Sequence, residues 1–137
     1  MGKIKTIGID TMLFIYHFQQ HPQYFSSTQR IFSQVEKGDI EAVTSFISYL
    51  ESCSLAELDG KTSILQQYKA LFQEFPNLKT MFPNYEISEI AAKLRRKYEV
   101  AAPDALQIAT AISAGAEEFI TNDKKLLKIK EIKVVLL

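Results

Sequence analysis

The sequence predicts an α/β protein, a three-layer α/β/α sandwich around a central, mostly parallel sheet of four to five strands. Short runs of apolar and β-branched residues alternate along the chain with segments of helical periodicity, which is typical of parallel sheets with helices on both faces. The 137 residues are 47% hydrophobic, enough for an ordinary core. No internal repeat, low-complexity segment or linker interrupts this pattern. We therefore expect one domain over residues 1–137.

The first half of the chain supplies two of the predicted strands. Gly8 lies in the first apolar run and permits close approach of a neighbouring element. Ser45 is a favourable cap for the helix that follows the second strand, Gly38 ends a helix, and helices end before Pro22 and Pro76 because the residue before proline avoids the helical region. The expected elements are a strand at 4–9, helices at 12–18 and about 27–37, a strand at 41–44, and helices at about 45–58 and 61–75.

The second half continues the alternation. Pro103 suits the first turn of a helix, and the helix before it has Leu94 on its apolar face and mostly charged residues opposite. The expected elements are a short strand at 78–82, helices at 88–99 and 103–114, a strand at 118–121, a short helix at 124–128 and a last strand at 132–137.

Composition and charge exclude several classes of protein. The net charge is zero, which argues against binding nucleic acid by bulk electrostatics, although nine of the sixteen Lys and Arg lie between Lys93 and Lys133. No apolar run reaches the ~18 residues of a membrane span, and the N-terminus has no signal-peptide core. The single Cys53 cannot form an internal disulfide. A cytoplasmic protein with no membrane association is expected.

Three of the five aspartates stand at the ends of predicted elements. Asp10 follows the first strand, Asp104 opens a helix after Pro103, and Asp123 follows the strand at 118–121. Each acid alone is explained equally well as a helix cap or first-turn acid. Together, however, such carboxylates would repel one another, and a hard divalent cation is the usual compensation. Because Asp10 and Asp123 directly follow strands, we expect them to share one edge of the sheet, where parallel sheets bind ligands.

Four stretches resemble, in order, the motifs of the PIN-domain family, the nuclease fold of VapC-type toxins in bacterial and archaeal toxin–antitoxin pairs. The stretches are Asp10-Thr11 with Phe14-Ile15-Tyr16, then Thr44 to Glu51, Ala102 to Ala111, and Phe119 to Leu126. The spacing of the second motif selects Glu51 rather than Glu57. Two positions depart from the family: Met12 replaces a small polar residue, commonly Asn, and Gln107 replaces a residue that is often His.

The resemblance implies a divalent-metal-dependent endoribonuclease that hydrolyses RNA to a 5′-phosphate and a 3′-hydroxyl. The metal-binding and catalytic carboxylates would be Asp10, Glu51, Asp104 and Asp123, holding one or two Mg²⁺ or Mn²⁺ ions. The side chains that orient a carboxylate or a water would be Thr11, Thr121 and Asn122. The implied partners are an RNA substrate, a cognate antitoxin protein and a second copy of the chain in a homodimer.

Other polar and aromatic residues each have two possible roles, one functional and one structural. The basic side chains Arg95, Arg96, Lys97, Lys124 and Lys125 either contact RNA phosphates or form ordinary solvated helix faces. Tyr16, Phe18 and Tyr24 either stack on bases or, more simply, pack within the protein. His17 and His21 have the i, i+4 spacing of a zinc pair but no third ligand in register.

Two further functions compete with the ribonuclease. One is a PIN-fold RNA- or protein-binding module with weak or no catalysis, which only Met12 favours. The other is a receiver-like phosphoacceptor domain, which needs a pair of acids after the first strand, whereas this chain has Asp10 alone.

Overall fold

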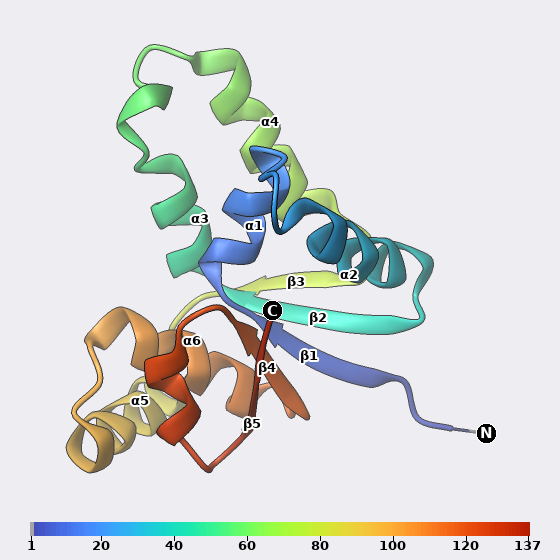
Figure 1. Ribbon diagram of the computed structural model, residues 1–137. Coiled ribbons are helices and arrows are strands. Elements are labelled where there is room, and N and C mark those ends of the chain that lie inside the picture. Colours follow the sequence, from blue (N-terminus) through green and yellow to red (C-terminus); the bar gives the residue numbers. More distant parts are fainter. Residues whose placement is uncertain (1) are drawn as a thin grey trace.

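The computed structural model describes residues 2–137 and contains one sheet of five strands (Figure 1). All the strand pairs are parallel, and the strand order is β3-β2-β1-β4-β5. The strands are β1 (Lys5–Ile9), β2 (Ile40–Ser45), β3 (Leu78–Met81), β4 (Glu118–Thr121) and β5 (Lys133–Leu136). The predicted α/β class and sheet are confirmed, and the strand count is the upper of the two expected values.

Helices cover both faces of the sheet and complete the three layers (Figure 1). The helices are α1 (Thr11–Phe18), α2 (Phe25–Lys37), α3 (Phe46–Cys53), α4 (Thr62–Glu74), α5 (Tyr85–Tyr98) and α6 (Ala102–Ser113), with short 3₁₀ helices η1 (Ala56–Leu58) and η2 (Lys124–Lys128). Helices α1 to α4 pack on one face, whereas α5 and α6 pack on the other. Within residues 2–137 no helix is both long and apolar enough to cross a membrane.

Two helix boundaries differ clearly from those predicted, and one segment with the predicted bounds is a different type of helix. The helix expected to reach residue 58 ends at Cys53, where the Ser54 hydroxyl donates to the Leu50 carbonyl at 2.6 Å and competes with the continuing helix. Helix α5 begins at Tyr85, earlier than predicted, because the Asn84 side chain accepts from the Ile87 amide at 2.8 Å and caps it. The segment at 124–128 is a 3₁₀ helix, the tighter form common in short connections.

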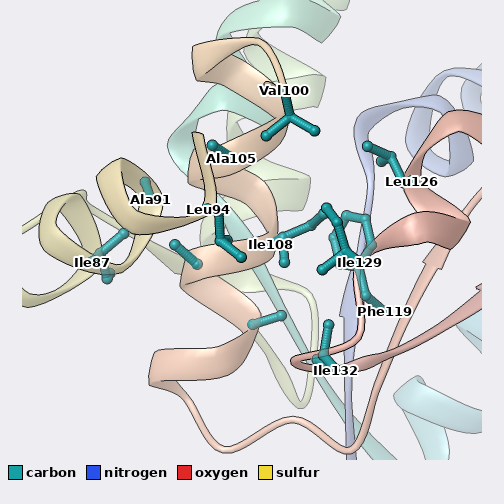
Figure 2. Packing of buried hydrophobic residues seen from close by; sticks show 12 residues of the cluster. Ile87, Ala91, Leu94, Val100, Ala105, Ile108, Phe119, Leu126, Ile129 and Ile132 are labelled. Atoms are coloured by element: carbon teal, nitrogen blue, oxygen red, sulfur yellow. The ribbon is translucent and has the colours of Figure 1, made fainter. Parts of the chain in front are cut away.

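Two hydrophobic clusters hold the helices to the sheet. The α6 cluster joins α5, α6, β4 and the C-terminal segment, and Figure 2 shows its side chains converging. Its buried members are Ile87, Ala91, Leu94, Val100, Ala105, Ile108, Ala109, Ala111, Phe119, Leu126, Ile129 and Ile132. The aromatic cluster lies on the opposite face. Its buried members are Ile7, Ile9, Leu13, Phe14, Phe32, Val35, Ala42, Phe72 and Ile120.

Gly8 allows α6 to lie directly against β1; the close approach was predicted from the sequence, and the structure identifies α6 as the element that makes it. A Cβ atom on Gly8 would lie 2.5 Å from the Ala111 Cβ and 3.0 Å from the Phe119 Cδ1. Any side chain at this position would therefore push α6 away from the sheet. The close contact fixes the position of the helix that carries Asp104.

Candidate functional site

Asp10 and Asp123 follow neighbouring strands at the same edge of the sheet. Strand β1 pairs with β4, and the Asp10 amide donates to the Ile120 carbonyl at 3.0 Å. Both aspartates also cap helices, since Asp10 Oδ1 accepts from the Thr11 amide at 2.8 Å and Asp123 Oδ1 accepts from the Lys125 amide at 2.9 Å. The shared edge and the capping explanation are both confirmed. Capping therefore does not compete with a second role.

The four acids singled out in the sequence line one cleft of about 510 Å³. They come from four different elements: Asp10 precedes α1, Glu51 lies on α3, Asp104 lies in the first turn of α6, and Asp123 precedes η2. The remaining lining residues are Thr11, Met12, Ile15, Tyr16, Leu55, Thr121 and Asn122. The fold thus brings together residues that are up to 113 positions apart in the sequence.

The acids are close enough to affect one another's charge. Burial raises the pKa of Asp10 from 3.8 to about 6, and repulsion by Asp104 and Glu51 adds to the increase, whereas hydrogen bonds from Thr121 and the Thr11 amide oppose it. Burial also raises the pKa of Asp104, as does repulsion by Asp123 and Glu51, and Lys125 partly offsets these effects. The cleft is therefore a region of negative charge that Lys125 compensates only in part.

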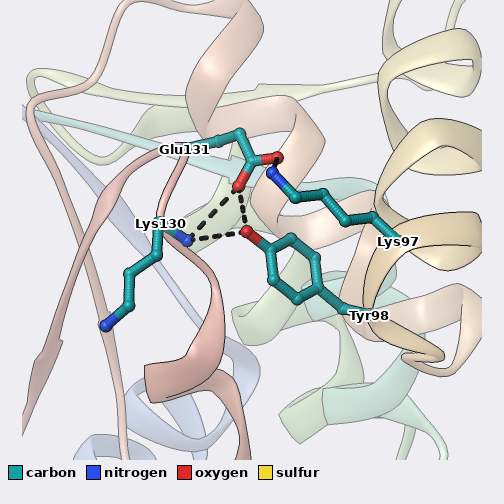
Figure 3. Close-up of polar contacts among 4 residues, drawn as sticks. All are labelled: Lys97, Tyr98, Lys130 and Glu131. Carbon is teal, nitrogen blue, oxygen red and sulfur yellow. Dashed lines mark hydrogen bonds and ion pairs between the residues drawn. The ribbon is translucent and has the colours of Figure 1, made fainter.

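No basic side chain forms an ion pair with these acids among residues 2–137. The ion pairs found there join Lys5 and Lys133 to Glu118 and Lys97 to Glu131. Figure 3 shows the second of these sites, where Glu131 also accepts a hydrogen bond from the Tyr98 hydroxyl. The carboxylates of the cleft remain free to bind a cation from solution.

The donor set suits a hard divalent cation, because carboxylate oxygens are the preferred protein ligands of Mg²⁺ and Mn²⁺. No three His, Cys, Asp or Glu side chains in the described part of the chain are already grouped closely enough to hold an ion. The residues therefore have the ligand atoms that such a cation prefers, but their side chains are not arranged as a complete coordination shell.

Two of the three predicted orienting side chains contact the acids. The Thr11 hydroxyl donates to Glu51 Oε1 at 2.6 Å, and the Thr121 hydroxyl donates to Asp10 Oδ2 at 2.7 Å. Asn122 lines the cleft, but its amide donates to the Tyr16 hydroxyl at 3.0 Å. Each threonine thus fixes one oxygen of a different carboxylate.

The predicted basic residues divide into two groups. Lys125 lies near enough to Asp104 to lower its pKa, and Lys124 begins the same short helix. Lys97 is paired with Glu131 at 3.2 Å (Figure 3), and Arg95 donates to the Val100 carbonyl at 3.3 Å. None of Arg95, Arg96 and Lys97 lines the acidic cleft.

The aromatic residues and histidines near the cleft are engaged mainly with one another. The rings of Tyr16 and Tyr24 stack at a centroid distance of 4.6 Å, and His21 lies 4.8 Å from Tyr16. Nδ1 of His21 accepts from the amides of Gln23 and Tyr24. These contacts agree with packing roles and leave no pair of histidine nitrogens directed at a common ion.

Two polar residues beside the acids were not assigned a role from the sequence. Gln107 and Ser48 are buried, with 2% and 0% of their surfaces exposed, and they hydrogen-bond to each other at 2.7 Å. Gln107 follows Asp104 by three residues, and Ser48 precedes Glu51 by three. A polar residue one helical turn from an acid is the signal that could have identified both.

Comparison with known proteins gives a family and a set of similar folds. The sequence model described as the PIN domain matches residues 7–132. None of the curated protein sequences resembles the chain closely enough to count as a match.

The similar solved structures share the fold at low sequence identity. DNA-bound VapBC from Salmonella typhimurium has a TM-score of 0.66 at 17% identity, over 98% of both chains. VapC20 from Mycobacterium tuberculosis, described as a sarcin–ricin loop cleaving toxin, has a TM-score of 0.68 at 12% identity, over 94% of this chain and 99% of its own. VapBC-1 from nontypeable Haemophilus influenzae has a TM-score of 0.67 at 21% identity, over 95% and 96% of the two chains.

Proposed function

The chain belongs to the PIN domain family, and from that premise we propose that it is a divalent-metal-dependent endoribonuclease, the toxin of a toxin–antitoxin pair. The strongest support is the meeting of four carboxylates, none with a basic partner among residues 2–137, in one cleft. Repulsion of this kind is relieved when a cation binds. The nuclease domain is proposed to span the whole of residues 1–137.

Asp10, Glu51, Asp104 and Asp123 are the proposed ligands and catalytic carboxylates. A bound Mg²⁺ or Mn²⁺ would supply Lewis acidity toward the phosphodiester and toward the attacking water. The Thr11 hydroxyl holds one oxygen of Glu51 and leaves the other for the cation. Both oxygens of Asp10 accept a hydrogen bond, from the Thr11 amide and the Thr121 hydroxyl, and each keeps a further lone pair for the cation. Lys124 and Lys125, beside the cleft, are the basic residues best placed to meet RNA phosphates.

The toxin role and the partners rest on the kind of protein that shares the fold. The similar structures include complexes of toxin and antitoxin from Klebsiella pneumoniae and Salmonella typhimurium. We propose that this chain likewise binds a cognate antitoxin protein, acts in the cytoplasm and forms a homodimer. Phe82 and Tyr85, 71% and 89% exposed, and Leu50, 59% exposed, are candidates for the dimer interface. Light scattering of the purified protein would give the oligomeric state.

Cleavage of total RNA would test the function directly. Wild type, Asp104→Asn and the control Asp59→Asn, whose carboxylate is exposed in a turn, would each be assayed with Mg²⁺, Mn²⁺ or EDTA. We expect discrete fragments only with metal, and a loss of at least ~100-fold for Asp104→Asn, the scale of removing one electrostatic contribution to the transition state. The control should match wild type. Full activity of Asp104→Asn would remove this residue from the proposed quartet.

The alternative is a PIN-fold module that binds RNA or protein without useful catalysis. The observation in its favour is Met12, which is 39% exposed and lines the cleft with an apolar side chain where the PIN-domain motif commonly has a small polar residue. A folded wild type that binds RNA tightly but leaves it intact with every metal would select this alternative.

A further inference from the structure

Gln107 is a buried polar residue at the junction of four elements. It lies on α6, one turn after Asp104, and its amide reaches the end of β2, the first turn of α3 and the start of α1. Only 2% of its surface is exposed, and its neighbours on the same helix, Ile108 and Ala109, are fully buried and apolar. A buried amide must satisfy its donors and acceptor within the protein, so its partners define its role.

The orientation of the Gln107 amide is fixed by a partner that can only donate. The backbone amide of Ser45 donates to Oε1 at 3.3 Å, so this atom must be the carbonyl oxygen. Nε2 is then left to donate its two protons, to Thr11 Oγ1 at 2.9 Å and to Ser48 Oγ at 2.7 Å. All the hydrogen-bonding groups of the side chain are thereby used.

The hydroxyl protons next to Gln107 can be assigned in turn. The Thr44 hydroxyl donates to the Ile9 carbonyl at 2.8 Å, so it accepts from Ser48, 2.6 Å away. The Thr11 hydroxyl accepts from Gln107 and donates to Glu51 Oε1 at 2.6 Å, since its other possible acceptor, Ser48, is 3.4 Å away. The donors thus run in one direction, from Gln107 through Thr11 to Glu51.

Glu51 needs such support more than Asp10 does. It is exposed on α3, whereas Asp10 is held by two hydrogen bonds of its own. A long, exposed carboxylate loses rotamer entropy when it binds an ion. Holding one of its oxygens beforehand removes part of that loss, because the side chain is already ordered.

We propose that Gln107 is a positioning residue that fixes the Thr11 hydroxyl toward Glu51 and thereby sets the affinity of the cleft for its divalent cation. The inference rests on the proposed metal-dependent function. Gln107 touches neither substrate nor cation in this scheme and acts only through Thr11.

Gln107→Met tests the proposal, because methionine has a similar length and no donor. We expect Mn²⁺ affinity, measured by isothermal titration calorimetry, to fall by roughly 10-fold, the lower end of the range for partners that orient metal ligands. Cleavage of RNA should fall at low Mn²⁺ and recover at saturating Mn²⁺, since no ligand is removed. The control is Thr110→Val, fully buried on the same helix, whose hydroxyl bonds to the Leu106 carbonyl and to no other group within residues 2–137. This variant should bind Mn²⁺ as wild type does.

Thr11→Val separates positioning from general damage to the fold. If Gln107 acts through Thr11, this variant alone should weaken Mn²⁺ binding to a similar extent, and adding Gln107→Met should weaken it no further. Additive losses would mean that Gln107 affects the cleft by another route and would overturn the proposal. Thr11→Val also carries the test if Gln107→Met does not fold, because wild-type Mn²⁺ affinity in Thr11→Val would itself contradict the proposal.

The outcomes distinguish this inference from the proposed function. Unchanged Mn²⁺ affinity in folded Gln107→Met would overturn the positioning role while leaving the nuclease intact. A second outcome is that the wild type binds Mn²⁺ but cleaves no RNA, while Gln107→Met binds Mn²⁺ more weakly. This outcome would support the positioning role and contradict the proposed nuclease activity. A wild type that binds no Mn²⁺ would overturn both.

Discussion

The two faces of the sheet are packed with different kinds of side chain. In the α6 cluster, Ala105, Ala109 and Ala111 are at most 1% exposed, and α6 approaches so closely that Gly8 has no room for a Cβ atom. On the opposite face, the ring of Phe14 packs against those of Phe72, Phe32 and Phe18 at centroid distances of 4.6, 5.3 and 6.2 Å. The α6 face thus has a close backbone contact at Gly8 in addition to its large side chains, whereas the opposite face has a cluster of aromatic rings at its centre.

This difference matches what each face contributes to the candidate site. Helix α6 carries Asp104 and Gln107, and close packing leaves its backbone little freedom. The opposite face carries α3. Its Glu51 is exposed to solvent and accepts a hydrogen bond from the Thr11 hydroxyl. The close packing of α6 can therefore position Asp104 without further contacts. The position of Glu51, on the other face, depends on the hydrogen bond from Thr11, which in turn bonds to Gln107 of α6.

The largest expected effect on stability comes from adding one carbon atom to the tight face. Gly8→Ala would bring its Cβ to 2.5 Å from the Ala111 Cβ, within a rigid helix–strand contact. We expect a loss of about 3 kcal/mol in the free energy of unfolding, at the upper end for overpacked cores. Urea denaturation followed by circular dichroism would measure it.

A second substitution at the same contact provides the control. Adding Ala111→Gly to Gly8→Ala removes the nearest clashing atom, although glycine within a helix itself costs about 1 kcal/mol. The double variant should therefore be more stable than Gly8→Ala alone. If it is less stable, the loss in the single variant does not come from the approach of α6 to β1.

The next largest effect is expected where the two faces meet, at Asp10. Its pKa is about 6 in the folded protein and 3.8 as a model value, so the folded state holds the proton more tightly than the unfolded state. Without metal, this group therefore favours folding below about pH 4, and the advantage is lost as the pH rises through 6. Two pKa units correspond to an upper limit of about 3 kcal/mol.

Asp10→Asn removes the charge and keeps the shape of the side chain. In metal-free solution at pH 7.5 we expect it to be more stable than wild type by about 2 kcal/mol, and this gain should disappear near pH 4. With excess Mn²⁺ the wild type should become the more stable of the two, because only the wild type has a carboxylate at position 10 to bind the ion. Equal stabilities across this pH range would show that Asp10 is not strained by burial and neighbouring charge.

The sequence predicted those features that depend on local patterns. The alternation of apolar runs and helical segments gave the layers, and strand ends at Asp10 and Asp123 gave their shared edge, which the pairing of β1 with β4 confirms. The cap at Asn84 was missed because it lies in a loop-like stretch after Pro83, and a helix start there looks no different from a turn. Helix boundaries of this kind depend on single hydrogen bonds.

Polar contacts between residues far apart in the chain could not be predicted from the sequence. Gln107 bonds to Thr11, Ser45 and Ser48, which are 96, 62 and 59 residues away. Nothing in the local sequence states which hydroxyls a buried amide will meet, since this depends on how closely α6 lies against the sheet. The resemblance to a family drew attention to Gln107 as a departure, but only the fold shows its partners.

The smallest of these effects is expected from a substitution within the aromatic cluster. Phe14 is fully buried, and four aromatic rings, counting its own, meet around it. Phe14→Leu removes part of one ring, and the three neighbouring rings have tilted, adaptable contacts that can close over the space. We expect a loss of about 1 kcal/mol in the free energy of unfolding, measured by urea denaturation as for Gly8→Ala.

Removing several atoms here should thus cost less than adding one atom at Gly8. A loss as large as that of Gly8→Ala would mean that both faces are equally rigid, and the reason given for the dependence of Glu51 on Thr11 and Gln107 would then fail.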